Sequence, residues 1–142
     1  MAHWQNSIVI FAPAERVFAY VDEPLSIPDW LPGMVEVRNV IGTDAGQQYE
    51  WMYKMGGVLW RGQAIVVEHV HNKSTVHQNI GSISAVCEFT VEPHEEGASL
   101  TVEVEYSIPI PVLGKLAEHI VMARNDRELD LSLQNIKDVV EV

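Results

Sequence analysis

Cysteine is nearly absent from this chain of 142 residues, in which Cys87 stands alone. An intramolecular disulfide is therefore excluded, and we expect a reducing compartment, the cytoplasm. No stretch approaches the ~20 consecutive apolar residues that a transmembrane helix needs. Residues 1–7 also lack the basic region followed by an apolar run that is typical of a signal peptide. The sequence thus predicts a protein without stable insertion into a membrane.

Basic residues are scarce as well. Lys and Arg together number 9, against 20 Asp and Glu, and the formal net charge is -11. A nucleic-acid backbone needs clustered cations, and so does electrostatic docking on an anionic membrane. The charge therefore argues against both partners, and an acidic surface mainly favours solubility.

The common catalytic motifs are missing: there is no glycine-rich phosphate loop, no HExxH and no GxSxG. Cys87 alternates with Ala85 and Phe89 on an apolar strand face, which is more typical of a small buried hydrophobe than of a nucleophile. His69 and His71 share a strand face and His77 follows in the next strand, but no acidic or thiol ligand stands at an obvious spacing. We expect no metal and no cofactor, and we predict no catalytic residue.

The segment 111–142 organises the rest of the chain. No proline follows Pro111, Gly114 is its only glycine, and a single helix of ~28 residues would be ~42 Å long. Such a helix must bury an apolar stripe against a sheet. The stripe comprises Leu129, Leu133, Ile136 and Val140, continued upstream by Met122.

A second apolar group in this segment faces roughly the opposite way; it comprises Leu113, Leu116, Ala117 and Ile120. Either the helix kinks or breaks near residues 124–126, or its first half covers a ligand, a loop or a partner. We interpret the charged side chains at 124, 126–128 and 130 mainly as a face exposed to solvent.

The preceding residues alternate as strands separated by turns. We predict a first strand over 4–11, two short helical segments that begin near Pro13 and Leu25, and a second strand that begins at Met34. Five further strands follow over 47–55, 58–71, 75–80, 84–92 and 99–108. The fold class is therefore α+β: a seven-stranded curved antiparallel sheet with two short helices after the first strand and a long C-terminal helix.

Aromatic residues concentrate on the predicted sheet. Tyr49, Trp51 and Tyr53 alternate on one strand face, and ordinary core packing explains many of the other aromatic side chains. If this face is concave, however, Tyr49, Trp51 and Tyr53 would form a pocket with hydroxyl and indole donors. If the alternation is displaced by one residue, the same side chains would point outward. The predicted ligand-binding residues are Trp30, Tyr49, Trp51, Tyr53, Phe89, Tyr106 and Met122.

The chain resembles the START/Bet v 1-like superfamily, and within it the bacterial polyketide cyclase/dehydrase and lipid-transport type proteins. The similarity rests on residues 7–37, SIVIFAPAERVFAYVDEPLSIPDWLPGMVEV, on the glycine turns, and on residues 128–141, ELDLSLQNIKDVVE. It implies a single domain over 1–142 with a helix-grip fold, in which the sheet grips the C-terminal helix around a hydrophobic pocket. Members bind lipids, polyketides, quinones or hormones, and some catalyse cyclisation. No motif shared by the superfamily defines a reaction.

Three functions are compatible with these observations. The one we favour is non-catalytic binding of a hydrophobic small molecule, a lipid, quinone or polyketide, between sheet and helix. A cyclase or dehydratase would need an ionisable group in the pocket; the candidates are Glu50, Arg61, His77 and His119. Arg61 is the cation most able to reach it, although a surface ion pair is the more usual role for such a residue. A protein-interaction module would instead use Leu113, Leu116 and Ile120. We expect a monomer or a homodimer.

Overall fold

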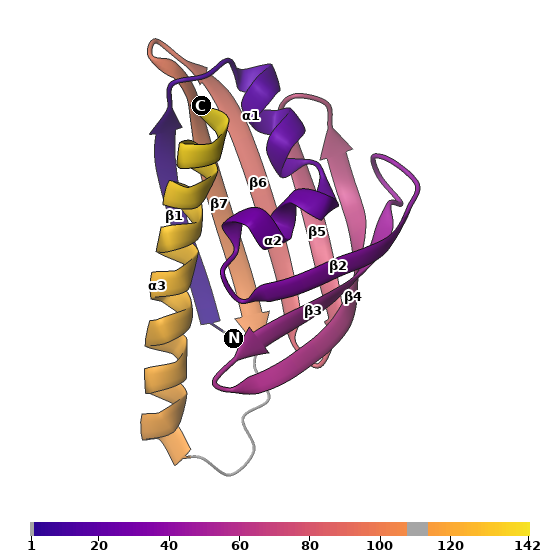
Figure 1. Ribbon diagram of the computed structural model, residues 1–142, viewed down its shortest axis with the longest axis vertical. Coiled ribbons are helices and arrows are strands. Elements are labelled where there is room, and N and C mark those ends of the chain that lie inside the picture. Colours follow the sequence, from indigo (N-terminus) through magenta and orange to yellow (C-terminus); the bar gives the residue numbers. More distant parts are fainter. Residues whose placement is uncertain (1, 108–113) are drawn as a thin grey trace.

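The computed structural model describes the backbone of residues 2–107 and 114–142, and the side chains of residues 2–107 and 124–142. It confirms the α+β class and the helix-grip architecture (Figure 1). The elements in chain order are β1 (Ala2–Ile10), α1 (Ala14–Val21), the 3-10 helix η1 (Pro24–Ser26), α2 (Ile27–Trp30), β2 (Met34–Ile41), β3 (Gln48–Met55), β4 (Val58–Val70), β5 (Ser74–Gly81), β6 (Ser84–His94), β7 (Gly97–Ser107) and α3 (Gly114–Val140).

The seven strands form one antiparallel sheet in the order β1-β7-β6-β5-β4-β3-β2. Tight turns connect consecutive strands from β2 onward, and the turn between β3 and β4 shows why. Gly56 and Gly57 have φ of 60° and 77°, and Met55 pairs directly with Val58. A two-residue turn with positive φ at both positions matches the twist of a hairpin, and glycine adopts it without strain.

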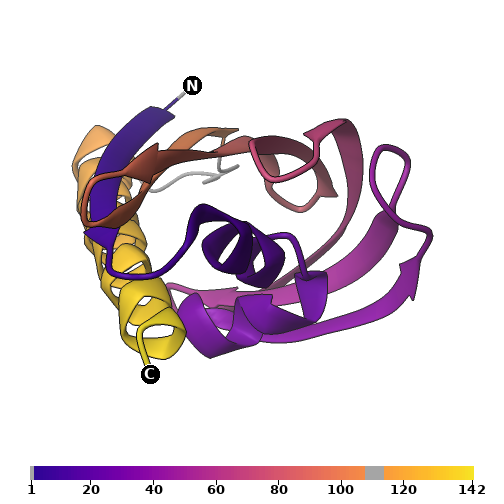
Figure 2. The same cartoon turned by 90° about the horizontal axis from the view of Figure 1, so that it is seen from above.

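The two edges of the sheet, β1 and β2, are consecutive in sequence but lie at opposite ends of the strand order. The connection between them contains α1, η1 and α2. Viewed from above, the sheet curves around α1, and α3 lies beside β1 (Figure 2). Val17, Phe18 and Val21 form the buried side of α1. This arrangement leaves the interior between the concave face and the helices.

Helix α3 is continuous from Gly114 to Val140, so the break that the sequence suggested near 124–126 does not occur. Its stripe is as predicted where side chains are described: Leu133, Ile136 and Val140 are buried, and Leu129 packs against the core. Met122 and the second apolar group lie outside the residues whose side chains the structure describes.

The prediction that the charged cluster of α3 is mainly solvated holds for Arg124, Arg127 and Asp130, which are exposed, whereas Asp126 and Glu128 are partly buried. Asp130 Oδ1 accepts a hydrogen bond from the indole nitrogen of Trp4 at 3.0 Å. Asp126 and Glu128 accept hydrogen bonds from tyrosines of the sheet, described below. These contacts tie the helix to the sheet.

Candidate functional site

A cavity of about 140 Å³ lies between the concave face of the sheet, α2 and α3. It is lined by side chains from α1, α2, β2, β3, β5, β6, β7 and α3, together with Leu31 and Ile83 from connecting segments. Aromatic and aliphatic side chains dominate the lining, and the polar exceptions are few. A concave apolar site with a small number of placed polar groups is the usual form of a small-molecule site.

Six of the seven predicted ligand-binding residues line this cavity: Trp30, Tyr49, Trp51, Tyr53, Phe89 and Tyr106. The seventh, Met122, lies outside the described side chains. Within the cavity, the indole of Trp30 donates to Ser26 Oγ at 3.2 Å, and its ring packs edge-on against Phe89 with centroids 6.0 Å apart. The structure thus brings the six together, and their role in binding a ligand stays a prediction.

Several lining residues were not predicted. Val102 and Val104 share the inward face of β7 with Tyr106, and Ala85 and Cys87 share that of β6 with Phe89, so alternation alone was sufficient to include them. Asn79 and Asn125 gave no such signal, because polar residues at inward positions break the hydrophobic pattern on which the prediction depends. His77 was named only as a candidate ionisable group for catalysis.

The deep polar group of the cavity is a pair formed by Tyr49 and His77. The Tyr49 hydroxyl lies 2.7 Å from His77 Nδ1, and His77 is only 3% exposed. Burial lowers the pKa of His77 to about 4 and outweighs the opposing attraction of the Asp22 carboxylate, and burial raises the pKa of Tyr49. Both side chains are therefore neutral at pH 7.

The tautomer of His77 decides the direction of this hydrogen bond. If Nε2 carries the proton of the neutral imidazole, the Tyr49 hydroxyl donates to Nδ1; if Nδ1 carries it, Nδ1 donates to the hydroxyl oxygen. The Nε2 atom is buried and has no hydrogen-bond partner within the described part of the chain.

The indole nitrogen of Trp51 also lacks a partner among the described residues. The indole lies on Gly62 of β4, where a Cβ atom would stand 2.3 Å from Trp51 Cζ2. Glycine at this position therefore makes room for the ring. An unsatisfied buried N–H such as that of Trp51 costs ~1–3 kcal/mol.

The rim of the cavity beside α3 is built from tyrosine–carboxylate pairs. The Tyr53 hydroxyl donates to Glu128 Oε1 at 2.8 Å and lies 3.3 Å from Asn125 Oδ1. The Tyr106 hydroxyl donates to Asp126 Oδ1 at 2.9 Å. Burial and the Glu128 charge raise the pKa of Tyr53, so these hydroxyls act as donors and not as acids.

Of the four ionisable groups considered for catalysis, His77 lines the cavity. Arg61 does not: it pairs with Met52 in the register of β3 and β4 and is exposed on the outer face, which agrees with a surface role and not with the pocket. Glu50 also points outward and forms an ion pair with Arg38 at 3.3 Å. The side chain of His119 lies outside the described residues.

The three histidines considered as metal ligands do not form one ligand group in the described structure. His69 lies between two carboxylates, with Nε2 3.0 Å from Asp22 and Nδ1 3.7 Å from Asp44. A single ion cannot use both nitrogens, but one of them, with Asp22 and Asp44, forms a group whose possible ligand atoms lie within 4.8 Å of one another. His77 is engaged with Tyr49 as described above.

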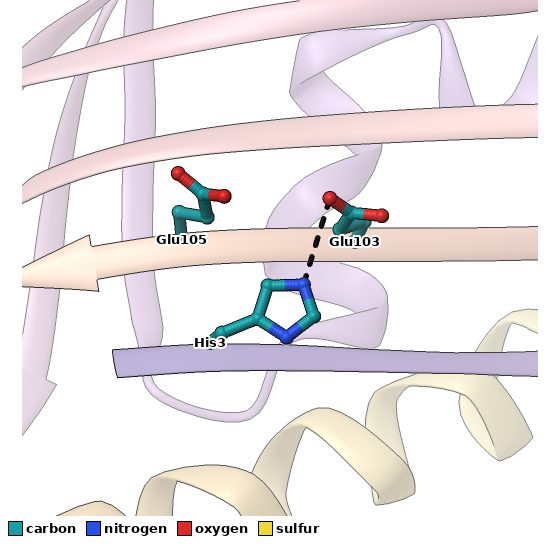
Figure 3. Close-up of side chains that lie close together, drawn as sticks. All are labelled: His3, Glu103 and Glu105. Atoms are coloured by element: carbon teal, nitrogen blue, oxygen red, sulfur yellow. Dashed lines mark ion pairs between the residues drawn. The ribbon is translucent and has the colours of Figure 1, made fainter. Parts of the chain in front are cut away.

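A different group of possible ligands, His3, Glu103 and Glu105, lies on the outer face of β1 and β7 (Figure 3). His3 Nε2 is 3.5 Å from Glu103 Oε1, and both side chains are about half exposed. This pairing is an ordinary surface contact, and it contributes little in water. None of these residues lines the cavity.

The model of one protein family, described as polyketide cyclase / dehydrase and lipid transport, matches residues 1–141. The chain belongs to this family. No curated protein sequence matches it significantly. The family assignment, together with the fold, places the chain in the START/Bet v 1-like superfamily that the sequence resembled.

Solved structures show the same fold at low sequence identity. The protein TTHA0849 from Thermus thermophilus is 17% identical with a TM-score of 0.84, over 98% of this chain and 97% of that chain. A START superfamily protein from Mycobacterium smegmatis is 15% identical with a TM-score of 0.77, over 98% and 97%. The Zhui aromatase/cyclase from Streptomyces sp. R1128 is 13% identical with a TM-score of 0.78, over 99% and 93%.

Among the described residues of this family member, no helix combines the length and the apolar character that crossing a membrane requires.

Proposed function

We propose that this protein binds a hydrophobic small molecule in the cavity between the sheet and α3. The observation that carries the proposal is the lining: it consists of aromatic and aliphatic side chains, and no Lys, Arg, Asp or Glu of the described residues contributes to it. Lipid, quinone and polyketide-like molecules have this apolar character. The family description, polyketide cyclase / dehydrase and lipid transport, supports the same class of ligand.

The energetics favour an occupied cavity. At ~24 cal/mol per Å³, keeping about 140 Å³ dry and empty costs ~3 kcal/mol. Small domains have a total stability of only ~5–15 kcal/mol. A cost of this size is explained if a ligand fills the space.

Native mass spectrometry of the purified protein, before and after extraction with organic solvent, tests the proposal directly. We expect a bound species that extraction removes. In the extracted protein, the neutral fluorescent probe N-phenyl-1-naphthylamine should bind with an increase in emission, because the cavity excludes water.

Two adjacent positions of β6 supply a matched pair of variants for this assay. Ala85 lines the cavity, whereas Val86 points to the outer face and is 38% exposed. Ala85→Phe should fill the cavity and weaken probe binding by about tenfold or more, while Val86→Phe should leave it unchanged. Equal binding by both variants would place the probe elsewhere and contradict the proposal.

A cyclase or dehydratase is the second candidate, and one observation favours it: His77 is ionisable and lines the cavity. A neutral imidazole is able to polarise a ketone or to move a proton during loss of water. A structural neighbour is an aromatase/cyclase. Incubation with a poly-β-keto thioester should then yield a dehydrated cyclic product by mass spectrometry, and His77→Phe should abolish it; no product from the wild-type protein leaves binding as the function.

We also propose that the protein works in the cytoplasm, because its cysteine is unpaired and lies in the wall of the cavity. Sedimentation will test whether it is a monomer or a homodimer.

A further inference from the structure

We infer that the protein binds Zn²⁺ through one ring nitrogen of His69 and one carboxylate oxygen from each of Asp22 and Asp44. None of these three residues lines the cavity, so the inference does not depend on the proposed function. The ion has a structural role: it joins the end of α1 to β4 and to the turn between β2 and β3.

The three side chains come from segments that are distant in sequence. Asp22 follows the last residue of α1, Asp44 lies in the turn between β2 and β3, and His69 lies near the end of β4. One possible ligand atom from each residue lies within 4.8 Å of the other two. Two atoms that bind the same tetrahedral zinc ion are ~3.3–3.6 Å apart. Small movements of the side chains are therefore sufficient to form the site.

The histidine and the turn that carries Asp44 are both held by the fold. The side chain of His69 is only 4% exposed, and the Phe18 ring packs edge-on against its imidazole, with centroids 5.5 Å apart. A backbone hydrogen bond of 2.8 Å from Gly46 N to Val66 O attaches the turn to β4. Ligands that the fold already positions bind an ion with little further ordering.

The charges at this place favour a divalent cation. Among the described residues, neither Asp22 nor Asp44 forms an ion pair with a Lys or Arg. A protonated His69 neutralises one of the two carboxylates at most, and its separation from Asp44, 3.7 Å, is too long for a hydrogen bond. A divalent ion neutralises both.

The donor set indicates which divalent ion binds. Mg²⁺ and Ca²⁺ prefer sites made of oxygen atoms alone. One imidazole nitrogen with two carboxylate oxygens is a set that suits Zn²⁺, which commonly takes three protein ligands and a water molecule. The side chain of Asp44 is 70% exposed, so water has access to the fourth position.

Titration calorimetry of the EDTA-treated protein with Zn²⁺, and separately with Mg²⁺, tests the inference. We expect one tight site for Zn²⁺ and none for Mg²⁺. Asp44→Asn should weaken the binding of Zn²⁺ by at least about tenfold, and because Asp44 is exposed the variant should still fold. Asp138→Asn is the matched control, since Asp138 is exposed on α3 and outside the group; its affinity should equal that of the wild type.

A second group in the described structure, His3, Glu103 and Glu105, could also hold an ion, and His3→Gln distinguishes the two. The tight site should persist in His3→Gln. Its loss in that variant would place the ion on the outer face of β1 and β7 and overturn the inference. Equal affinity of Asp44→Asn and the wild type, or no binding of Zn²⁺ by the wild type, would do the same. The proposed function is unaffected by any of these results.

A measurement on the wild-type protein does not depend on the folding of a variant. His69 and His71 both pack against the Phe18 ring, but His71 is exposed and outside the group. In protein labelled with ¹⁵N-histidine, one equivalent of Zn²⁺ should shift the ring nitrogen resonances of His69 and leave those of His71 nearly unchanged. Similar shifts at all the histidines would mean that the ion binds adventitiously and would contradict the inference.

Discussion

Glu128 of α3 and Tyr53 of β3 share a hydrogen bond of 2.8 Å at the rim of the cavity. The same carboxylate oxygen accepts the backbone N–H of Gly33 at 2.7 Å. One side chain of the helix therefore holds both a sheet strand and the segment that leads from α2 into β2. These elements enclose the cavity, so Glu128 is placed to determine how firmly it is closed.

We predict that Glu128→Ala lowers the free energy of unfolding by ~2–4 kcal/mol, because it removes a charged acceptor from two donors and leaves them without a partner. Urea unfolding followed by tryptophan fluorescence measures this change. Glu92→Ala is the control: Glu92 is exposed on β6, and its loss should change stability by no more than ~0.5 kcal/mol. Equal effects of the two substitutions would show that the Glu128 contacts are not formed in solution.

The outcome at Glu128 also shows where sequence reasoning was limited. Charged residues at consecutive helix positions are usually solvated, and nothing local distinguishes Glu128 or Asp130 from their neighbours. Their partners, Tyr53 and Trp4, are more than 70 residues away in sequence. Such contacts depend on how the helix is placed against the sheet, which a periodicity does not specify.

The strands show the opposite case. In β3 three of the four inward residues are aromatic and three of the four outward ones are polar, so alternation gave the correct face of Tyr49, Trp51 and Tyr53. In β5 the inward residues that reach the cavity are His77 and Asn79, and Ile80 on the other face is 52% exposed. The hydrophobic pattern of β5 therefore does not show which of its residues face inward. Asn79 was missed for this reason, and His77 was named only as a candidate ionisable group.

The apolar stripe of α3 yields a second stability prediction. Ile136 is completely buried, whereas Val139 on the same helix is 44% exposed. Ile136→Ala should lower the free energy of unfolding by ~2–5 kcal/mol, since it leaves a cavity in a packed interior. Val139→Ala should cost less than ~1 kcal/mol. Thermal unfolding by circular dichroism distinguishes the two, and a similar cost at both positions would mean that another face of α3 packs on the sheet.

The buried imidazole predicts a pH dependence of stability. His77 has a pKa of about 4 in the folded protein, against ~6.5 in an unfolded chain. Between these values the unfolded state binds a proton that the folded state does not. Stability is therefore highest above pH ~6.5 and falls by up to about 3 kcal/mol as the pH decreases to ~4.

Urea unfolding at several pH values, compared between the wild type and His77→Phe, isolates this contribution from that of the carboxyl groups, which titrate in both proteins. The wild type should lose stability relative to the variant as the pH falls through this interval. Parallel curves for the two proteins would mean that His77 is accessible to protons in the folded state.

The thiol of Cys87 yields the last prediction. Its side chain lines the cavity, and burial raises its pKa to about 12, against the smaller opposing effect of a hydrogen bond from Asn79. Because the thiolate is the reactive form, iodoacetamide should modify the native protein at least ~100-fold more slowly than the unfolded one. The chain has one cysteine, so the protein in urea is its own control. Rapid modification of the native protein would show that the cavity opens to water often and that its wall is not the dry surface on which the proposed ligand class depends.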